Sequence, residues 1–256
     1  MQLLDINNII FFIMASCRTA GCIFFNPIFG RSSVPDSIKI GLSLALGWFA
    51  MEGAENTYVG EMLTMAFIVS VAKEFVVGFA LGYIMRLFLS IFTLSGYVID
   101  MQAGYSMATL YDASSNSQIS VTGNLMTIMY SLLFFVTGSH LNLVNLIVKT
   151  YDVIPVGFVQ VNHEIGLYMI RLFGYMLVYA LQLAIPFIVL ELLTEVSVGI
   201  LMKMVPNINV FVVNIHLKMI VGLIILLTII PALTNFMIRI NAIMFERMGD
   251  AMNYMM

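Results

Sequence analysis

Long apolar runs separated by short polar stretches dominate this chain and leave very few folds open to it. The runs are Ile9–Phe29, Met62–Ile99, Leu125–Val148, Ile165–Leu190 and Val210–Ile238. A helix needs about 20 apolar residues to cross a bilayer. Charged residues make up only 10% of the chain, whereas a soluble domain has about 25%. We therefore expect an all-α integral membrane protein with about five to seven spans.

Charge placement excludes one class of partner and gives no orientation. The chain has 11 Lys and Arg against 14 Asp and Glu. The cations are scattered singly, which argues against nucleic acid binding. Lys73, Arg86, Arg171 and Lys218 lie inside apolar runs rather than in loops, so the positive-inside rule gives no topology. This pattern suits helices that pack against other subunits rather than lipid.

The N-terminal part is expected to stay in the mature protein. Its first ten residues carry only Asp5 as a charge, whereas a signal peptide begins with a basic region. Cys17 and Cys22 fit small apolar packing residues better than a disulfide or a metal site. A second helix, about Ser37–Met51, is too short to cross a bilayer by itself.

The segment Asp100–Asn124 differs most from the rest of the chain. It is rich in Ser, Thr, Asn and Gln and has no Lys or Arg. This composition predicts a loop, and loops longer than about 12–15 residues are usually functional or disordered. Because strongly apolar blocks flank it, we expect a loop next to a membrane or a pore.

The ionisable residues inside the apolar runs have a structural and a functional interpretation. Lys73, Glu74 and Arg86 form either an ion pathway or structural ion pairs, and we favour the pairs. Adjacent residues on a helix point in different directions, so Lys73 and Glu74 need separate partners. His140 and His216 each lack a ligand-type neighbour at helical spacing, which favours satisfied, isolated histidines.

No catalytic motif is present in the sequence. The chain has no nucleotide-binding loop, GxSxG or HExxH. Ser139 beside His140 does not make a catalytic pair. We expect no enzyme activity, no catalytic residue, no metal site and no cofactor.

The segment Pro206–Gly222 resembles a known family motif that reads close to PQxNVFxxGxPLKxxxGL. Asn207, Asn214 and His216 depart from it. The pattern is that of the FliR family, flagellar biosynthetic proteins of the type III export apparatus. The matching residues are Pro206, Asn209, Val210, Phe211, Leu217, Lys218, Gly222 and Leu223.

Other segments resemble the same family in the same order. Glu74, Gly78 and Gly82 match its EXXXGXXXG-like helix, and the two glycines also form a GxxxG pattern that permits close helix packing. Further matches are Arg18, Pro27–Gly30, Val34–Pro35, Gly96–Asp100, Gln102–Gly104, Gly138–His140 and Pro155–Gly157.

The resemblance implies long helical hairpins with a long polar central loop, packed in a hetero-oligomeric helical assembly. Family members join FliP- and FliQ-like subunits, and an FlhB-like subunit, in an export gate of the flagellar basal body in the bacterial inner membrane. Unfolded protein substrates cross this gate, and a central loop plugs it at rest. The plug maps here to Gly104–Gly123, with the residues Gly104, Tyr105, Ser106, Met107, Tyr111, Asp112, Ser114, Asn116 and Gly123. Residues carried over for assembly are Glu74, Gly78, Gly82, Pro206, Asn209, Val210, Phe211, Lys218 and Gly222.

Two alternatives stay open at this point. One is the homologous subunit of a virulence injectisome, SctT, which sequence separates poorly from the flagellar protein. The other is a secondary transporter for a small solute. A transporter predicts an internal inverted repeat with broken helices at matching positions, and no such repeat is visible by eye.

Overall fold

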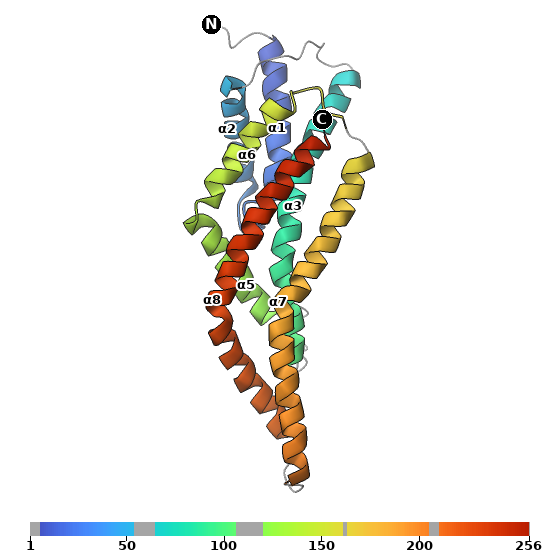
Figure 1. Cartoon of the computed structure of the whole chain (residues 1–256). Helices are drawn as coiled ribbons and strands as arrows, with labels where there is room; N and C mark the ends of the chain where they lie inside the picture. The colour runs from blue at the N-terminus through green and yellow to red at the C-terminus, as the bar shows by residue number, and fades with distance from the viewer. Residues whose placement is uncertain (1–5, 54–64, 106–119, 161–162, 205–209, 256) are drawn as a thin grey trace. The chain divides into compact units, whose positions relative to one another are not determined.

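Helices make up most of the residues that the structure describes, and turns join them. This computed structural model describes residues 6–53, 65–105, 120–160, 163–204 and 210–255, and no strand occurs among them. The prediction of an all-α protein is confirmed. The helices in Figure 1 are α1 (Ile6–Phe25), α2 (Asp36–Gly53), α3 (Met65–Ala103), α5 (Val121–Val136), α6 (Ser139–Val153), α7 (His163–Met204) and α8 (Val210–Asn253).

Fewer helices could cross a membrane than the hydropathy runs predict. Among the described residues, α1, α3, α7 and α8 are long and apolar enough, and the bent pair of α5 and α6 makes up to five spans. The upper part of the expected range is therefore wrong. Within the predicted run Met62–Ile99, the described residues from Met65 onward belong to one helix, α3, which passes through the buried Glu74 without a break.

Helix boundaries follow backbone chemistry rather than hydropathy. Glu191 begins a more polar stretch, yet α7 continues through it to Met204. Leu125–Val148 reads as one apolar run, yet it divides between α5 and α6, which are bent by 71°. Gly138 lies at this break with a φ of 71°, a conformation that glycine adopts without steric cost.

The turn after α1 is fixed by one side chain. Asn26 is buried, and its Oδ1 accepts hydrogen bonds from the backbone nitrogens of Ile28 at 2.8 Å and Phe29 at 3.1 Å. Such a side-chain turn competes with helix continuation, and Pro27 directly after Asn26 cannot extend the helix.

The chain divides into two compact units, and helices α3, α5, α7 and α8 contribute residues to both. The first unit comprises residues 1–88, 134–173 and 241–256, and the second comprises 89–133 and 174–240. In the first unit α1 packs against α2, and α2 against α6 (Figure 1). Its core includes Ile10, Phe11, Met14, Ile84, Met85, Leu143, Ile147, Leu172, Met244 and Met248.

The second unit packs parts of α3 and α5 with parts of α7 and α8. Phe92 and Tyr130 stack with their ring centroids 4.8 Å apart. The Ser95 hydroxyl donates to the carbonyl oxygen of Ala180 at 2.9 Å, which joins α3 to α7. Other buried members of this core are Ile91, Ile99, Met126, Ala184, Phe187, Ile225, Leu233 and Met237.

Candidate functional site

A buried ion pair lies at the centre of the polar cluster in the first unit. The Arg18 Nε on α1 donates to Glu74 Oε2 on α3 at 2.6 Å, and the two side chains are 1% and 0% exposed. Two charges removed from water are stable only when both are paired and hydrogen-bonded. Each therefore depends on further partners.

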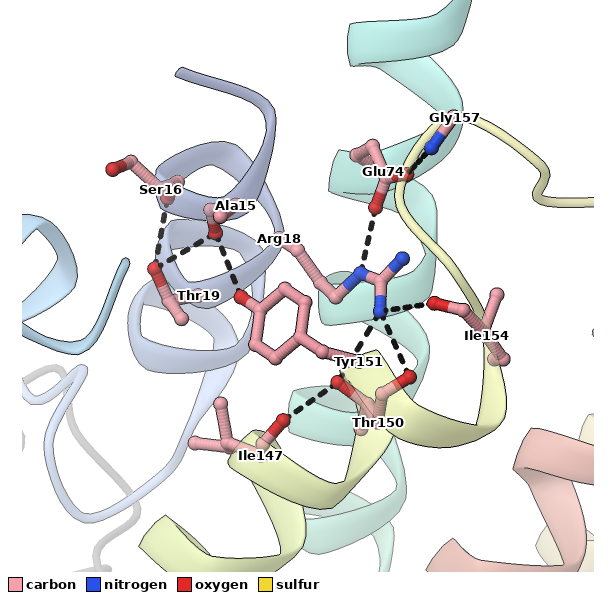
Figure 2. A network of polar contacts seen from close by, with 10 residues as sticks. All are labelled: Ala15, Ser16, Arg18, Thr19, Glu74, Ile147, Thr150, Tyr151, Ile154 and Gly157. Atoms are coloured by element: carbon pink, nitrogen blue, oxygen red, sulfur yellow. Dashed lines mark hydrogen bonds and ion pairs between the residues drawn. The ribbon is translucent and has the colours of Figure 1, made fainter. Parts of the chain in front are cut away.

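Backbone groups supply those partners (Figure 2). The Arg18 Nη1 donates to the carbonyl oxygens of Thr150 at 3.0 Å and Ile154 at 2.9 Å. The Gly157 N–H donates to Glu74 Oε1 at 2.7 Å. Gly157 has a φ of 89°, a value that a residue with a side chain rarely adopts. The cluster thus ties α1, α3 and the chain around the end of α6 into one unit.

Tyr151 and Thr19 close the cluster on its other sides. The Arg18 guanidinium lies 4.6 Å from the centroid of the Tyr151 ring, within the range of cation–π attraction. The Tyr151 hydroxyl donates to the Ala15 carbonyl oxygen at 2.9 Å, and the Thr19 hydroxyl donates to the Ser43 carbonyl oxygen on α2 at 2.8 Å. Arg18 Nη2 has no hydrogen-bond partner among the described residues.

Gly78 and Gly82 permit the close approach of α1 and α3 that this ion pair needs. A Cβ atom on Gly78 would overlap the Arg18 carbonyl oxygen, and one on Gly82 would lie 2.7 Å from the Cys22 carbonyl oxygen. The predicted close packing at the GxxxG pattern is confirmed, and the helix it admits belongs to the same chain. A part for these glycines in assembly with other subunits stays a prediction.

The other ionisable residues of the apolar runs are placed differently from Glu74. Lys73 and Arg86 are exposed, whereas Glu74 is buried in its pair with Arg18. His140 is half-buried beside the Phe135 ring, with ring centroids 5.4 Å apart. Its Nδ1 has no hydrogen-bond partner among the described residues, and a satisfied histidine at this position stays a prediction. His216 is exposed.

In the second unit, Asp100 joins the two ends of the polar segment. Its carboxylate accepts hydrogen bonds from the Ser120 hydroxyl at 2.7 Å and from the Thr122 N–H at 3.2 Å. The Ser120 hydroxyl oxygen in turn accepts from the Gly123 N–H at 2.8 Å. These contacts satisfy backbone donors at the start of α5, which a helix cannot satisfy by itself.

Two glycines bring the same ends together. A Cβ on Gly96 of α3 would overlap the backbone of Gly123 on α5. The helices also extend further into the segment than its composition predicts, because α3 continues to Ala103 and α5 begins at Val121. The predicted loop bounds of Asp100 and Asn124 are therefore too wide at both ends.

Helix α3 ends in a sharp turn, and a side-chain hydrogen bond holds the residue that follows the turn. Gly104 has a φ of 79°, and the Tyr105 hydroxyl donates to the Met219 carbonyl oxygen of α8 at 3.3 Å. Burial raises the pKa of Tyr105, and the negative charge of Asp100 raises it further. The phenol therefore stays neutral and keeps its donor hydrogen.

Much of the predicted plug and motif lies outside the described residues. This applies to Ser106, Met107, Tyr111, Asp112, Ser114 and Asn116 of the plug, and to Pro206 and Asn209 of the motif. Val210 and Phe211 begin α8. Gly104, Tyr105 and Gly123 lie at the two ends of the plug segment, within the second unit.

Lys218 and Gly222 of the motif lie beside two carboxylates of α7. Lys218 Nζ is 3.2 Å from Glu195 Oε2. Gly222 is buried, and a Cβ there would lie 3.1 Å from Glu191 Oε1 and 3.2 Å from the Ala103 Cβ. Glu191 is 0% exposed, and neither carboxylate oxygen has a hydrogen-bond partner among the described residues. The absent side chain of Gly222 makes room for this carboxyl group.

Comparison with known proteins decides the family. A sequence model described as bacterial export proteins, family 1, matches residues 9–243. The chain belongs to this family. The flagellar biosynthetic protein FliR of Escherichia coli K12 is 27% identical over 91% of this chain and 89% of its own length. FliR of Bacillus subtilis 168 is 27% identical over 84% of each, and the Yop proteins translocation protein T of Yersinia pestis is 24% identical over 78% of each.

The resemblance to the FliR family is thereby confirmed. The region that matches the bacterial export proteins contains every element of both clusters, from Arg18 to Gly222. It also contains the complete polar segment and the GxxxG pattern.

Sequence reasoning missed several residues of these clusters. Thr150, Ile154 and Gly157 contribute backbone groups, which leave no signal in side-chain patterns. In the sequence, Glu191 is the first residue after the apolar run Ile165–Leu190. Glu195 follows four residues later, which places both carboxyl groups on one helix face. This spacing could have indicated a group of interacting charges there.

Proposed function

We propose that this member of the bacterial export proteins is a structural and gating subunit of a flagellar type III protein export channel. The channel is a passive conduit for unfolded proteins, and the segment Gly104–Gly123 blocks it at rest. The family match over residues 9–243 is the observation that carries the export role. FliR names among the relatives favour the flagellum over other export systems.

The closed base of the polar segment supports the gating part. Asp100 binds Ser120 and the backbone of Thr122, and Gly96 lies against Gly123. The segment therefore leaves α3 and returns to α5 at a single anchored place. A plug needs such a base, because a segment held at both ends can be displaced by a substrate and still return.

The exposed apolar faces of α7 and α8 support assembly with other subunits. In the most apolar 18-residue stretch of each helix, 28% of α7 and 17% of α8 are buried within the chain, against 67% of α3. Large uncovered apolar faces mark contact with lipid or with protein partners. FliP- and FliQ-like subunits, with an FlhB-like subunit, are the partners we expect on these faces in the bacterial inner membrane.

Purification from the native cell tests the export role. The chain is tagged, extracted in mild detergent and analysed by mass spectrometry of what accompanies it. FliP- and FliQ-like subunits in stoichiometric amounts are the expected result. Recovery of the chain alone or as a homo-oligomer would overturn the proposal in favour of a solute transporter.

Replacement of residues 106–119 tests the plug. A short Gly-Ser linker in their place should leave the base at Asp100 intact and open the conduit to ions, measured as leakage through the membrane of the intact complex. A Gly-Ser linker of the natural length is the matched control for segment length. Unchanged leakage with the short linker would disprove the plug.

A second candidate is the equivalent subunit of a virulence injectisome. The observation in its favour is the Yop proteins translocation protein T, whose identity of 24% is near that of the flagellar relatives. Deletion of the gene separates the two candidates, because loss of filaments and motility is expected only for the flagellar subunit. The accompanying subunits from the purification give the same distinction independently.

A further inference from the structure

Glu191 is a carboxyl group that the fold buries without providing for its charge. It lies within α7, inside a helix long and apolar enough to cross a membrane. Its side chain is 0% exposed, and both oxygens lack a hydrogen-bond donor among the described residues. Burial of an ionised carboxylate without a partner costs far more than burial of the neutral acid.

The nearby cation is already bound to another group. Lys218 on α8 pairs with Glu195 at 3.2 Å, and these are the charged groups that face Glu191. From the end of α3, the Tyr105 phenol also faces it, and Asp100 faces Tyr105 in turn. Two ionised glutamates beside one lysine leave a net negative charge, whereas one bound proton makes this group neutral.

The surroundings of Glu191 exclude a cation from outside. Gly222 approaches Glu191 Oε1, and Ala103 and Phe187 also lie around this glycine. At 0% exposure no lysine or arginine of another subunit reaches the carboxyl group while α7 and α8 stay packed. A proton is the counter-charge that fits the space.

We propose that Glu191 is a proton-binding site in the membrane-spanning part of the second unit, occupied at neutral pH. Exchange of the proton with water requires α7 and α8 to separate at Gly222. Ala103 of α3 contacts the same place, directly before Gly104 at the start of the polar segment. The inference goes beyond the export role and does not require the segment to be a plug.

Infrared spectroscopy of the full-length protein, purified with its accompanying subunits, tests the proposal. A protonated carboxyl group has a carbonyl stretch at higher frequency than an ionised carboxylate, and the band shifts in deuterated water. The wild-type spectrum at neutral pH should contain this band. The difference spectrum between wild type and Glu191→Gln should assign the band to Glu191.

Glu195→Gln is the matched control, one helical turn away and 49% exposed on its side chain. It should keep the band, since the proposal places the proton on Glu191, and Glu195 instead pairs with Lys218. Absence of the band from the wild type at neutral pH would overturn the proposal without reference to any variant. Loss of accompanying subunits in Glu191→Gln with no such band would also overturn it, and would assign Glu191 to a cation from a partner.

Discussion

Glu74 and Glu191 are both 0% exposed in apolar helices, yet their surroundings differ completely. Glu74 has a guanidinium at 2.6 Å and a backbone N–H at 2.7 Å. Glu191 has no hydrogen-bond donor among the described residues, and the nearby Lys218 is bound to Glu195. The first carboxylate is completed inside the first unit, whereas the second depends on a proton.

The difference extends to the helices that carry these groups. The most apolar stretches of α1 and α3 are 56% and 67% buried in the chain, whereas those of α7 and α8 are 28% and 17% buried. Where helices pack within one chain, permanent partners can stabilise buried charges. Where helix faces contact lipid or other subunits, the neutral form of a buried carboxyl group costs less free energy than the ionised form.

Arg18→Ala should have the largest effect on this contrast. It leaves the Glu74 charge buried with a single N–H donor, and loss of one partner of a buried ion pair costs about 3–5 kcal/mol. We expect most of the folded protein to be lost, measured by thermal denaturation in detergent. The double variant Arg18→Met with Glu74→Leu removes both charges and should recover much of that loss. Equal instability of the double and single variants would show that charge is not what holds α1 to α3.

Gly78→Ala should have the next largest effect. The new Cβ overlaps the Arg18 carbonyl oxygen, and overpacking of this kind typically costs about 1–3 kcal/mol. Gly166→Ala is the control within the first unit, because its Cβ would meet nothing within 4 Å. In that helix alanine should be neutral or stabilising by up to about 1 kcal/mol. Similar melting temperatures for the two variants would contradict the tight contact of α1 with α3.

Asp100→Ala tests a carboxylate that is intermediate between Glu74 and Glu191, since hydrogen bonds rather than an ion pair satisfy it among the described residues. Loss of its bonds to Ser120 and Thr122 should cost about 0.5–2 kcal/mol, as for other helix caps. The effect should be local, so hydrogen exchange of the Thr122 and Gly123 amides should accelerate. Asp100→Asn keeps an acceptor oxygen and should give an intermediate rate. Unchanged exchange in Asp100→Ala would mean that the base of the polar segment is held by Gly96 and Gly123 alone.

Lys218→Met should have the smallest effect. Its partner Glu195 is half-exposed, and ion pairs open to solvent contribute at most about 1 kcal/mol. Glu195→Gln should give a loss of the same size, and the two changes together should add little. A loss as large as that of Arg18→Ala would break the comparison, because it would mean that Lys218 neutralises an ionised Glu191.

The sequence was sufficient for the helical membrane class because apolar content alone determines it. Helix ends were predicted less well, since hydropathy does not report backbone conformation. The predicted apolar run ends at Leu190, yet glutamate, leucine and methionine are good helix formers and α7 continues to Met204. Conversely, one glycine at position 138 breaks an apolar run that hydropathy joins.

The two clusters were only partly predictable for a different reason. The spacing of Glu74, Gly78 and Gly82 is local, and it predicted close packing that the structure confirms. The partners of Arg18 lie 56, 132 and 136 positions away, and contacts at such separations have no local pattern. Glu191 carries a spacing signal, but its lack of donors follows only from the three-dimensional surroundings.

The distances along the chain within the Arg18 cluster have a consequence for the order of synthesis. Arg18 leaves the ribosome within the first apolar helix, and its carboxylate partner follows 56 residues later. The carbonyl groups of Thr150 and Ile154, and the N–H of Gly157, come last. The newly made N-terminal helix therefore carries a cation without its counter-charge until Glu74 is made, and without its backbone partners for much longer. The complete set of partners for the Arg18–Glu74 pair is present only when about three fifths of the protein has been made.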